Sequence, residues 1–326
     1  MGLLNPLEQI QRLPDLSGRF SIEIDPEQKI ARFERLQNVP HCAHGVSHDG
    51  GNMAFSQEET QKRKEKVAKR LTKFLERIGI ENAINPITLA DEGNCAVAEL
   101  EDLTEKNSDA IQKNERGTFV NASALFTTTP DTPLVLKVAD CYGGLIYAKT
   151  PAGKTVVGLI HAGRLELGAR IVETSVQFLK KMYDVDPQNI IACFTPALAQ
   201  EHHVIRKDDI ERVLGTAQEY WRKHSTIDEE TGDWNINMKS ALKEQLKHAR
   251  ILASNISIDP RDTFQEAETF PSQRRTTQLG KPHEKAGRYA LAIAFTSSKG
   301  KHRAKAFLHT HSASIFKTSF LNNPIR

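Results

Sequence analysis

Three short apolar segments between residues 124 and 160 constrain the fold of this chain more than any other feature. They are Ala124–Phe126, Leu134–Ala139 and Thr155–Ile160, and each is rich in apolar side chains. Short apolar runs of this kind predict buried β-strands. Similar patterns predict strands at residues 20–24, 87–89, 96–98, 190–194, 256–258 and 289–295.

Helical periodicity appears on either side of these strands. Apolar residues recur at helical spacing over residues 57–78, where Ser56 is the predicted N-cap and Gly79 the predicted end. Further helices are predicted at residues 165–183, 207–224 and 237–249, and the charge-rich stretch 101–116 is predicted to be an exposed loop. This order of elements predicts one α/β domain with mixed strands, preceded by an N-terminal strand extension (residues 1–38).

Composition indicates an intracellular globular protein. The chain has 326 residues, 39% of them hydrophobic, which is enough for a core without disulfide support. It has no run of about 20 apolar residues and no signal-peptide pattern at Met1–Pro14, so we expect a cytoplasmic protein without membrane contact. The four cysteines lie about fifty residues apart. Their spacing favours reduced thiols and excludes a zinc finger.

The charge balance argues against a dedicated nucleic-acid binder. There are 44 basic and 41 acidic residues, which gives a formal net charge of +3. Residues 296–326 contain neither Asp nor Glu, and we expect them to form a basic C-terminal extension of the main domain, residues 39–295. Such a tail either steers an anionic partner or is simply a solvated extension.

Three chemically capable groups stand at the ends of predicted strands, each beside glycine. They are Asp91-Glu92-Gly93, Asp140-Cys141 and His161-Ala162-Gly163. Strand ends hold side chains firmly while exposing them to loops, so these groups can converge. A thiolate, an imidazole and a carboxylate form a zinc-ligand set. Cys141 and His161 can equally be a nucleophile and its base, or ordinary buried residues.

Two other segments supply binding chemistry. The segment from His41 to Gly51 combines three histidines with a glycine pair and is predicted to wall a pocket. Arg274, Arg275 and Arg288 form a candidate anion clamp, because guanidinium groups bind phosphate or carboxylate with two hydrogen bonds; the alternative is a surface ion-pair network.

Taken in order, these motifs resemble the YfiH-like, or laccase-domain, family of multicopper polyphenol oxidoreductase-like proteins. The strongest matches are Ala139-Asp140-Cys141 and His161-Ala162-Gly163, at the family's ADC and HAG motifs. Supporting matches are His41 with Gly50-Gly51, Pro196-Ala197, Ser272 with Arg274-Arg275, and Gly287-Arg288. The resemblance covers residues 39–295 and implies mixed β-sheets packed together and flanked by helices, as in the cytotoxic-necrotising-factor deamidases.

The resemblance also implies an activity and a metal. Family members resemble zinc-dependent enzymes of purine nucleosides, which act in phosphorolysis and in adenosine deamination. Their metal is held by a loop histidine, the ADC cysteine and the HAG histidine. Here these positions correspond to Glu92, Cys141 and His161, and Arg164 replaces a tryptophan of the family pattern.

We therefore hypothesise a metal-assisted purine nucleoside phosphorylase or adenosine deaminase-like enzyme. Zinc would be its metal, purine nucleoside and phosphate its substrates, His41 and Gly51 part of the nucleoside pocket, and Arg274, Arg275 or Arg288 the phosphate ligand. Copper is disfavoured, because one cysteine and scattered histidines do not make a multicopper set. The alternatives are a metal-free cysteine hydrolase or deamidase with a Cys141–His161 dyad, and a non-catalytic binding or regulatory protein with a decayed site.

Overall fold

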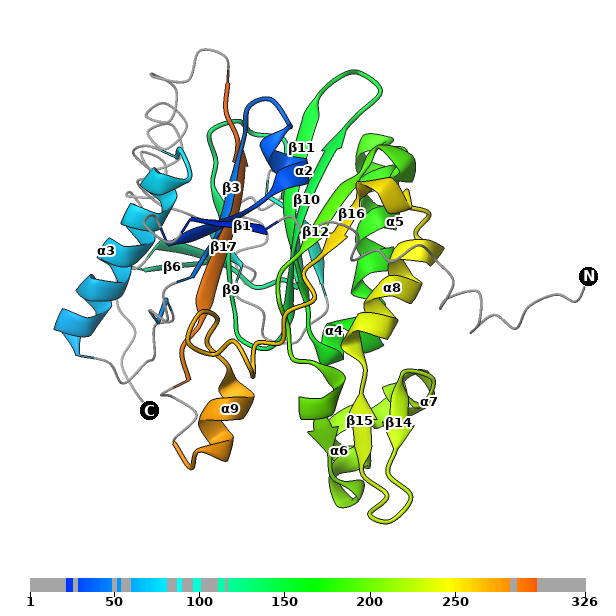
Figure 1. Cartoon of the computed structure of the whole chain (residues 1–326). Helices are drawn as coiled ribbons and strands as arrows, with labels where there is room; N and C mark the ends of the chain where they lie inside the picture. Colours follow the sequence, from blue (N-terminus) through cyan, green and yellow to red (C-terminus); the bar gives the residue numbers. More distant parts are fainter. Residues whose placement is uncertain are drawn as a thin grey trace, which may run out of the picture.

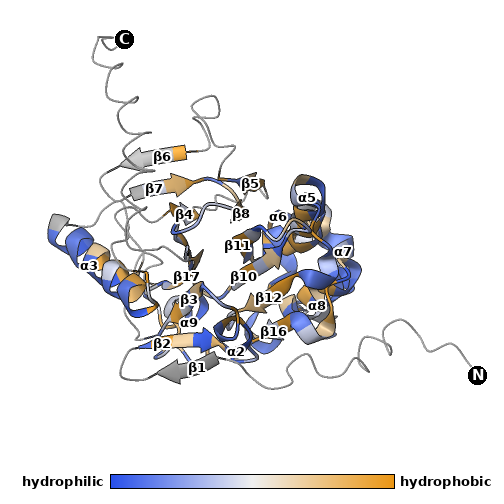
Figure 2. Ribbon diagram, turned by 90° about the horizontal axis from the view of Figure 1, so that it is seen from above, coloured by the Kyte–Doolittle hydropathy of each residue, from blue (hydrophilic) through white to orange (hydrophobic). Residues whose placement is uncertain are grey.

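The structure is a computed structural model that describes residues 22–25, 29–48, 52–53, 60–80, 87–89, 96–100, 111–114, 117–281 and 286–297. Two large sheets pack face to face, with a helix outside the first sheet and helices outside the second, so that the core has four layers (Figures 1 and 2). The predicted fold class, mixed sheets packed together and flanked by helices, is confirmed.

The first large sheet has eight described strands and combines strands from residues 22–138 with one strand from residues 289–295. Its order is β1 (Ile22–Asp25), β2 (Ile30–Phe33), β3 (Cys42–Ser47), β17 (Tyr289–Phe295), β9 (Leu134–Val138), β4 (Ile87–Leu89), β7 (Gly117–Val120) and β6 (Ile111–Asn114). The strand β17 lies between β3 and β9 and is antiparallel to both. Its neighbours therefore come from positions about 150 or more residues earlier in the sequence.

The second large sheet carries the middle of the chain. Its order is β16 (Ile256–Ile258), β12 (Ile191–Phe194), β10 (Tyr142–Lys149), β11 (Thr155–Ala162), β8 (Ala124–Thr127) and β5 (Val97–Glu99). A small sheet of β13 (Val204–Ile205), β15 (Trp234–Ile236) and β14 (Ser225–Ile227) projects below it (Figure 1).

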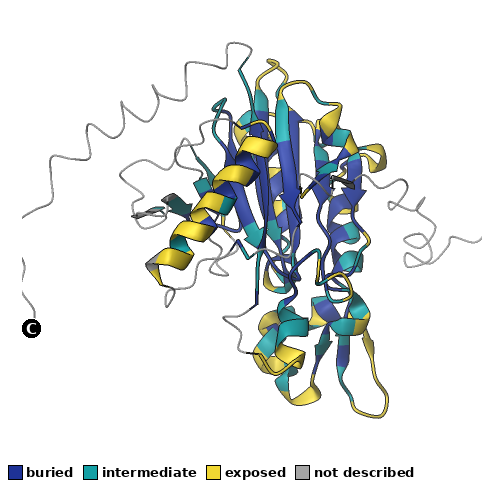
Figure 3. Ribbon diagram, turned by 60° about the vertical axis from the view of Figure 1, so that its left-hand side comes forward, coloured by how far each residue is buried: buried dark blue, intermediate teal, exposed yellow. Residues whose placement is uncertain are grey.

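Apolar side chains fill the spaces between the layers. Leu136 and Leu291 of the first sheet meet Leu145 and Leu159 of the second in one buried cluster. Behind the second sheet lie α4 (Arg164–Gly168), α5 (Ile171–Tyr183) and α8 (Met238–His248). Behind the first lies α3 (Gln61–Arg77), whose outer face is exposed while the strands beneath it are buried (Figure 3).

Several predicted elements differ from the structure. The predicted helix 165–183 is two helices, because Arg170 takes a left-handed backbone conformation (φ 61°) between α4 and α5. The predicted helix 207–224 is not continuous. A 3₁₀ turn at residues 207–209 precedes α6 (Ile210–Leu214), and a second one at residues 215–217 separates α6 from α7 (Gln218–Arg222). The predicted loop 101–116 contains β6. The helix predicted at 57–78 begins at Gln61, and its N-cap is Thr60, whose backbone is extended, so the predicted start at 57 with Ser56 as N-cap is wrong.

The predicted domain limits stay predictions. Strands β1 and β2 pair with each other and then with β3, so residues 22–33 share a sheet with the main domain. Residues 1–21 and 298–326 lie outside the described part. No helix within the described ranges is long and apolar enough to span a membrane.

Candidate active site

Cys141 lies at the turn where the chain passes from the first large sheet to the second. Strand β9 ends at Val138 and β10 begins at Tyr142, so the strand-end position predicted for Asp140-Cys141 is confirmed. The antiparallel register of β10 and β11 pairs Tyr142 with Ala162. Cys141 is therefore next to the end of β11, which carries His161.

Gly163 shows how closely the reactive groups approach one another. A Cβ atom on this residue would lie 2.8 Å from Cys141 Sγ, 2.7 Å from Glu166 Oε2 and 3.4 Å from His161 Cε1. Glycine leaves that space open, so a thiol, a carboxylate and an imidazole surround one point. The predicted pair Cys141 and His161 is brought together, and Glu166 joins it.

Glu166 is a buried carboxylate in the short helix α4. Its side chain is only 4% exposed, and its Oε2 lies 3.7 Å from His161 Nδ1. A carboxylate beside one ring nitrogen favours the tautomer in which that nitrogen carries the proton.

The residue before the cysteine anchors the site to two other loops. Asp140 has a left-handed backbone (φ 71°), which turns the chain between the two sheets. Its carboxylate accepts hydrogen bonds from Thr263 Oγ1 and from the backbone N–H of Arg274, both at 2.7 Å. Its carbonyl oxygen accepts one from the N–H of Leu198.

Arg164 places positive charge beside the thiol, and a second arginine, Arg274, lies near Arg164. Burial lowers the pKa of Arg164, and the nearby cation Arg274 lowers it further, whereas Cys141 and Glu166 raise it. Within the described residues, Arg164 Nε is buried and has no hydrogen-bond partner. Arg274 donates through Nη1 to the carbonyl oxygen of Val204. Such a partly buried pair of guanidinium groups favours a bound anion.

A buried histidine faces the same two arginines. Burial lowers the pKa of His203 to about 3, and Arg164 and Arg274 contribute to the shift. The ring is therefore neutral at pH 7. Its Nδ1 atom has no hydrogen-bond partner among the residues the structure describes.

The adjacent His202 forms an oriented imidazole of its own. Its Nδ1 lies 2.6 Å from Asp262 Oδ2, and its ring stacks on Phe264 at 4.1 Å. Asp262 is fixed in turn, because Oδ1 accepts hydrogen bonds from the N–H groups of Ala199 and Phe264. This pair lies on the two loops that Asp140 holds, so it belongs to the same end of the molecule.

The other predicted binding residues are more scattered. Arg275 donates to the carbonyl oxygen of Phe264, and Arg288 makes longer contacts with Gln273 and with the carbonyl of Gly287. Of the three arginines predicted to clamp an anion, Arg274 is the one that the structure places near the Cys141 site, through its charge interaction with Arg164.

His41 lies at the other end of the first sheet from Cys141. It precedes Cys42, which pairs with Phe295 at the end of β17, whereas Val138 pairs with Tyr289 at its beginning. At about 3.4 Å per residue, this separation along β17 is roughly 20 Å. Its prospective pocket partner Gly51 lies outside the described residues.

Cys141 differs from the other described cysteines. Burial raises the pKa of Cys42 to about 12, and burial raises that of Cys193 further still. Neither is a thiolate at neutral pH. Cys141 is partly exposed and lies beside the guanidinium group of Arg164.

The described residues supply suitable ligand atoms for a metal but do not form a complete metal site. Cys141, His161 and Glu166 match zinc in donor type, and the open space at Gly163 lies among them. As they stand, no three His, Cys, Asp or Glu side chains in the described ranges form a metal-holding group. Glu92, the third predicted ligand, lies outside those ranges.

Comparison with known families decides where the chain belongs. The model of the family described as multi-copper polyphenol oxidoreductase laccase matches residues 41–296, which is most of the chain. This chain belongs to that laccase-type family. The resemblance carried by the ADC and HAG motifs is therefore confirmed.

Solved structures show the same fold. The YfiH protein of Bacillus licheniformis has a TM-score of 0.65 and 18% identity, covering 84% of this chain and 99% of its own. The YlmD protein of Geobacillus stearothermophilus has a TM-score of 0.63 and 19% identity, over 85% and 99%. A Neisseria meningitidis protein of the family model DUF152 has a TM-score of 0.58 and 16% identity, over 79% and 95%. No curated protein sequence matches the chain.

Sequence reasoning missed five residues of this site: Arg164, Glu166, His202, His203 and Asp262. Glu166 follows His161 by five positions on the next helix, so a carboxylate soon after the HAG motif is a usable signal. His203 and the pair His202–Asp262 carry no such signal. Asp262 is 60 positions away from His202 in the sequence, so no local pattern links the two residues.

Proposed function

We propose that this laccase-type protein is a purine nucleoside phosphorylase, with adenosine deamination as the other reaction of the same site. The observation that carries the proposal is the meeting of Cys141, His161 and Glu166 around Gly163, with Arg164 and Arg274 beside them. Phosphorolysis needs an anion site next to a polar reaction centre, and this arrangement supplies both.

Arg164 and Arg274 bind the phosphate. Their mutual repulsion is relieved when a dianion lies between them, and the neutral ring of His203 adds a polar contact without competing charge. The bound phosphate oxygen forms the new bond to ribose C1′ as the bond from C1′ to the purine nitrogen breaks. Holding the phosphate in place supplies much of the rate increase, because it replaces an encounter in solution.

The departing purine needs one proton. His202 is the residue we assign to deliver it, because Asp262 fixes the Nδ1 side of its ring and its side chain is partly exposed. A carboxylate-oriented imidazole is the usual general acid near neutral pH.

Zinc would be held by Cys141, His161 and a carboxylate, for which Glu92 is the predicted residue. When bound, zinc supplies Lewis acidity toward the base or toward a water molecule. Glu166 then acts on His161, whose ring it orients through Nδ1. Partners of this kind are worth about 10- to 100-fold in metal affinity.

A metal-free cysteine hydrolase or deamidase is the second candidate. The same contact between Glu166 and His161 favours it, because a nucleophile, an imidazole and an orienting carboxylate form a catalytic triad. Metal analysis separates the two. Stoichiometric zinc in protein purified without added metal, lost in Cys141→Ala, contradicts the metal-free reaction.

Turnover of nucleosides tests the proposal itself. Purified protein is incubated with adenosine, inosine or methylthioadenosine, with and without phosphate, and the products are separated by chromatography. We expect phosphate-dependent release of free base, abolished in Cys141→Ala and retained in Cys42→Ala, whose thiol lies in a different part of the fold. If none of the nucleosides is consumed, the nucleoside reaction is excluded, and the cysteine hydrolase or deamidase and the non-catalytic binding protein are left.

A further inference from the structure

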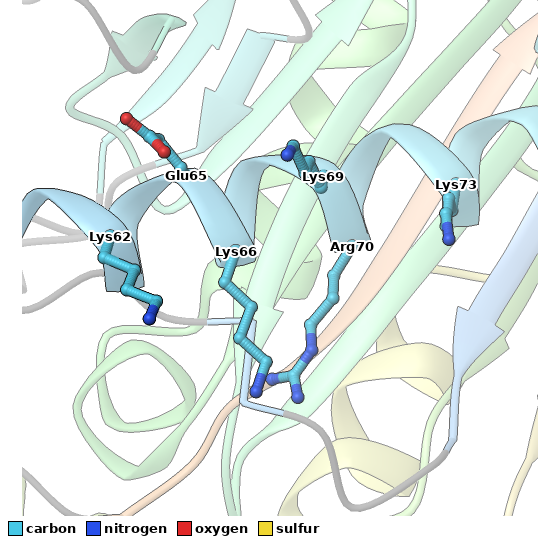
Figure 4. A pocket seen from close by; sticks show the side chains of 6 residues that line it. All are labelled: Lys62, Glu65, Lys66, Lys69, Arg70 and Lys73. Atoms are coloured by element: carbon cyan, nitrogen blue, oxygen red, sulfur yellow. The ribbon is translucent and has the colours of Figure 1, made fainter.

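The exposed face of α3 carries a straight row of lysines, which we call the α3 lysine row: Lys62, Lys66, Lys69 and Lys73 (Figure 4). All four are exposed. With Arg70 and Glu65 they line an open groove of about 500 Å³. The whole helix holds eight basic residues and two acidic ones, so the near neutrality of the chain conceals a strongly basic element.

The spacing of the row is regular. Successive lysines are three or four residues apart, which at 1.5 Å per residue is about 4.5–6 Å along the axis. The row is therefore about 16 Å long, and positions three and four apart share one face of a helix. The ion pairs found among the described residues do not involve these four lysines.

The row does not stabilise its own helix. The first turn of α3 has no acidic residue, and Lys62, Arg63 and Lys64 crowd the end where the helix dipole is already positive. Cations there cost stability, and like charges four residues apart repel each other. A bound anion would reduce both the unfavourable interaction with the helix dipole and the repulsion between the lysines. A face that is only solvated would be more stable with carboxylates at this end of the helix.

The buried side of α3 limits the type of partner. Val67, Leu71, Phe74, Leu75 and Ile78 are all at most 5% exposed and pack toward the first sheet. The described outer face of the helix thus has no large apolar side chain left to insert into a membrane. It also lacks the aromatic or aliphatic anchor around which protein interfaces are built, and lysine is depleted in such interfaces.

We propose that the α3 lysine row binds the phosphate backbone of double-stranded nucleic acid without sequence preference. A duplex presents a phosphate charge about every 1.7 Å of its axis, so a rigid row of cations meets several phosphates at once. Single strands are usually bound with stacked aromatic rings, and the exposed face of α3 has none. This inference is independent of the nucleoside chemistry at Cys141.

Salt-dependent binding tests the proposal. The probe is a fluorescein-labelled 20-base-pair DNA duplex of mixed sequence, and anisotropy is measured from 50 to 200 mM salt. Four phosphate contacts give a slope of about −3.6 in log K against log salt, which is a loss of about 150-fold over this range. Exchange of the four lysines for Glu should remove nearly all of this slope and weaken binding at least 10-fold at 50 mM salt. Exchange for Gln, which removes charge without reversing it, should act in the same direction.

The matched control reverses four exposed lysines elsewhere: Lys180, Lys181, Lys223 and Lys247. They lie on or beside α5, α7 and α8, on the opposite side of the molecule from α3 (Figure 1). This variant should bind like the wild type. The proposal is overturned if the wild type does not bind the duplex at 50 mM salt, or if both variants bind equally. Binding of the row to vesicles of anionic phospholipid in place of the duplex would instead make it a membrane-contacting surface.

Discussion

At the residue scale, the site depends on positions where few residue types fit the backbone conformation or the space available. Asp140 takes a left-handed backbone that aspartate tolerates better than most residues, and its carboxylate then reaches Thr263 and Arg274. Cys141 and His161 could be predicted because both follow apolar runs in a recognisable order. Glu166 stands close enough to the HAG motif to be a candidate, but its contact with His161 depends on how tightly α4 turns back after Gly163.

Gly163→Ala tests this closeness. The added methyl group would lie within 3 Å of both Cys141 Sγ and Glu166 Oε2, so at least one of them must move. A displacement of about 1 Å costs about 100-fold in catalysis, and overpacking costs about 1–3 kcal/mol of stability. We expect nucleoside turnover to fall about 100-fold while the protein still folds, as measured by steady-state kinetics and urea unfolding. Leu165→Ala, a truncation at a side chain 53% exposed, is the control and should leave both quantities nearly unchanged. Normal turnover in Gly163→Ala would show that these three groups do not act together.

At the element scale, strands were easier to predict than helix interruptions. The predicted strand 289–295 and helix 237–249 agree with β17 and α8, because apolar periodicity and the Asn237 N-cap mark them locally. The strand β10 was missed, since its Gly143-Gly144 pair resembles a turn. The break between α6 and α7 arises where Gly215 adopts φ 47° and ψ −129°, a conformation that nearly excludes other residues.

Gly215→Ala should therefore destabilise the protein. Alanine in this backbone conformation costs about 1–3 kcal/mol. The neighbouring substitution Thr216→Ala, at an exposed position, should change the free energy of unfolding by less than about 0.5 kcal/mol. Urea unfolding of both variants measures the difference. Equal stabilities would mean that the chain straightens into the continuous helix predicted from the sequence.

The junction of β2 and β3 predicts a pH dependence. His44 Nε2 accepts a hydrogen bond of 3.0 Å from the N–H of Phe33, which requires a neutral ring. Burial lowers the pKa of His44 to about 4, and Arg32 contributes. The unfolded chain has an ordinary histidine pKa of about 6.5 and binds a proton first on acidification. The contribution of His44 is thus complete above about pH 6.5 and is lost as the pH falls toward 4, by up to about 3 kcal/mol.

His44→Gln removes this titration while keeping a hydrogen-bond acceptor. We expect the wild type to lose stability more steeply than the variant between pH 6.5 and 4, as followed by urea unfolding at several pH values. Parallel curves would show that His44 is not held neutral in the fold.

At the scale of the whole molecule, the two large sheets approach closely where glycine takes the place of a larger residue. A Cβ atom on Gly143 in β10 would lie 2.7 Å from Leu291 Cδ2 in β17. These two residues are 148 positions apart in the sequence, so no local sequence pattern predicts their contact. The strand order of the first sheet, which joins β3 to β17 and β17 to β9, could not be predicted for the same reason.

A double-mutant cycle measures this contact. Gly143→Ala should cost about 1–3 kcal/mol through overpacking, and Leu291→Ala about 2–5 kcal/mol through a cavity. The double variant should be more stable than the sum of these losses by at least about 0.5 kcal/mol, because the added methyl group occupies the vacated space. Additive losses in urea unfolding would place the two residues out of contact.

The proposed phosphorolysis of a purine nucleoside at the Cys141 end of the sheets can be followed directly. Its most direct test follows ³¹P NMR spectra of inosine and phosphate with the wild type, with Cys141→Ala and with Cys42→Ala. We expect ribose 1-phosphate from the wild type and from Cys42→Ala, and none from Cys141→Ala. Formation of ribose 1-phosphate by Cys141→Ala at the wild-type rate, or its absence from the wild-type reaction, would contradict the proposal.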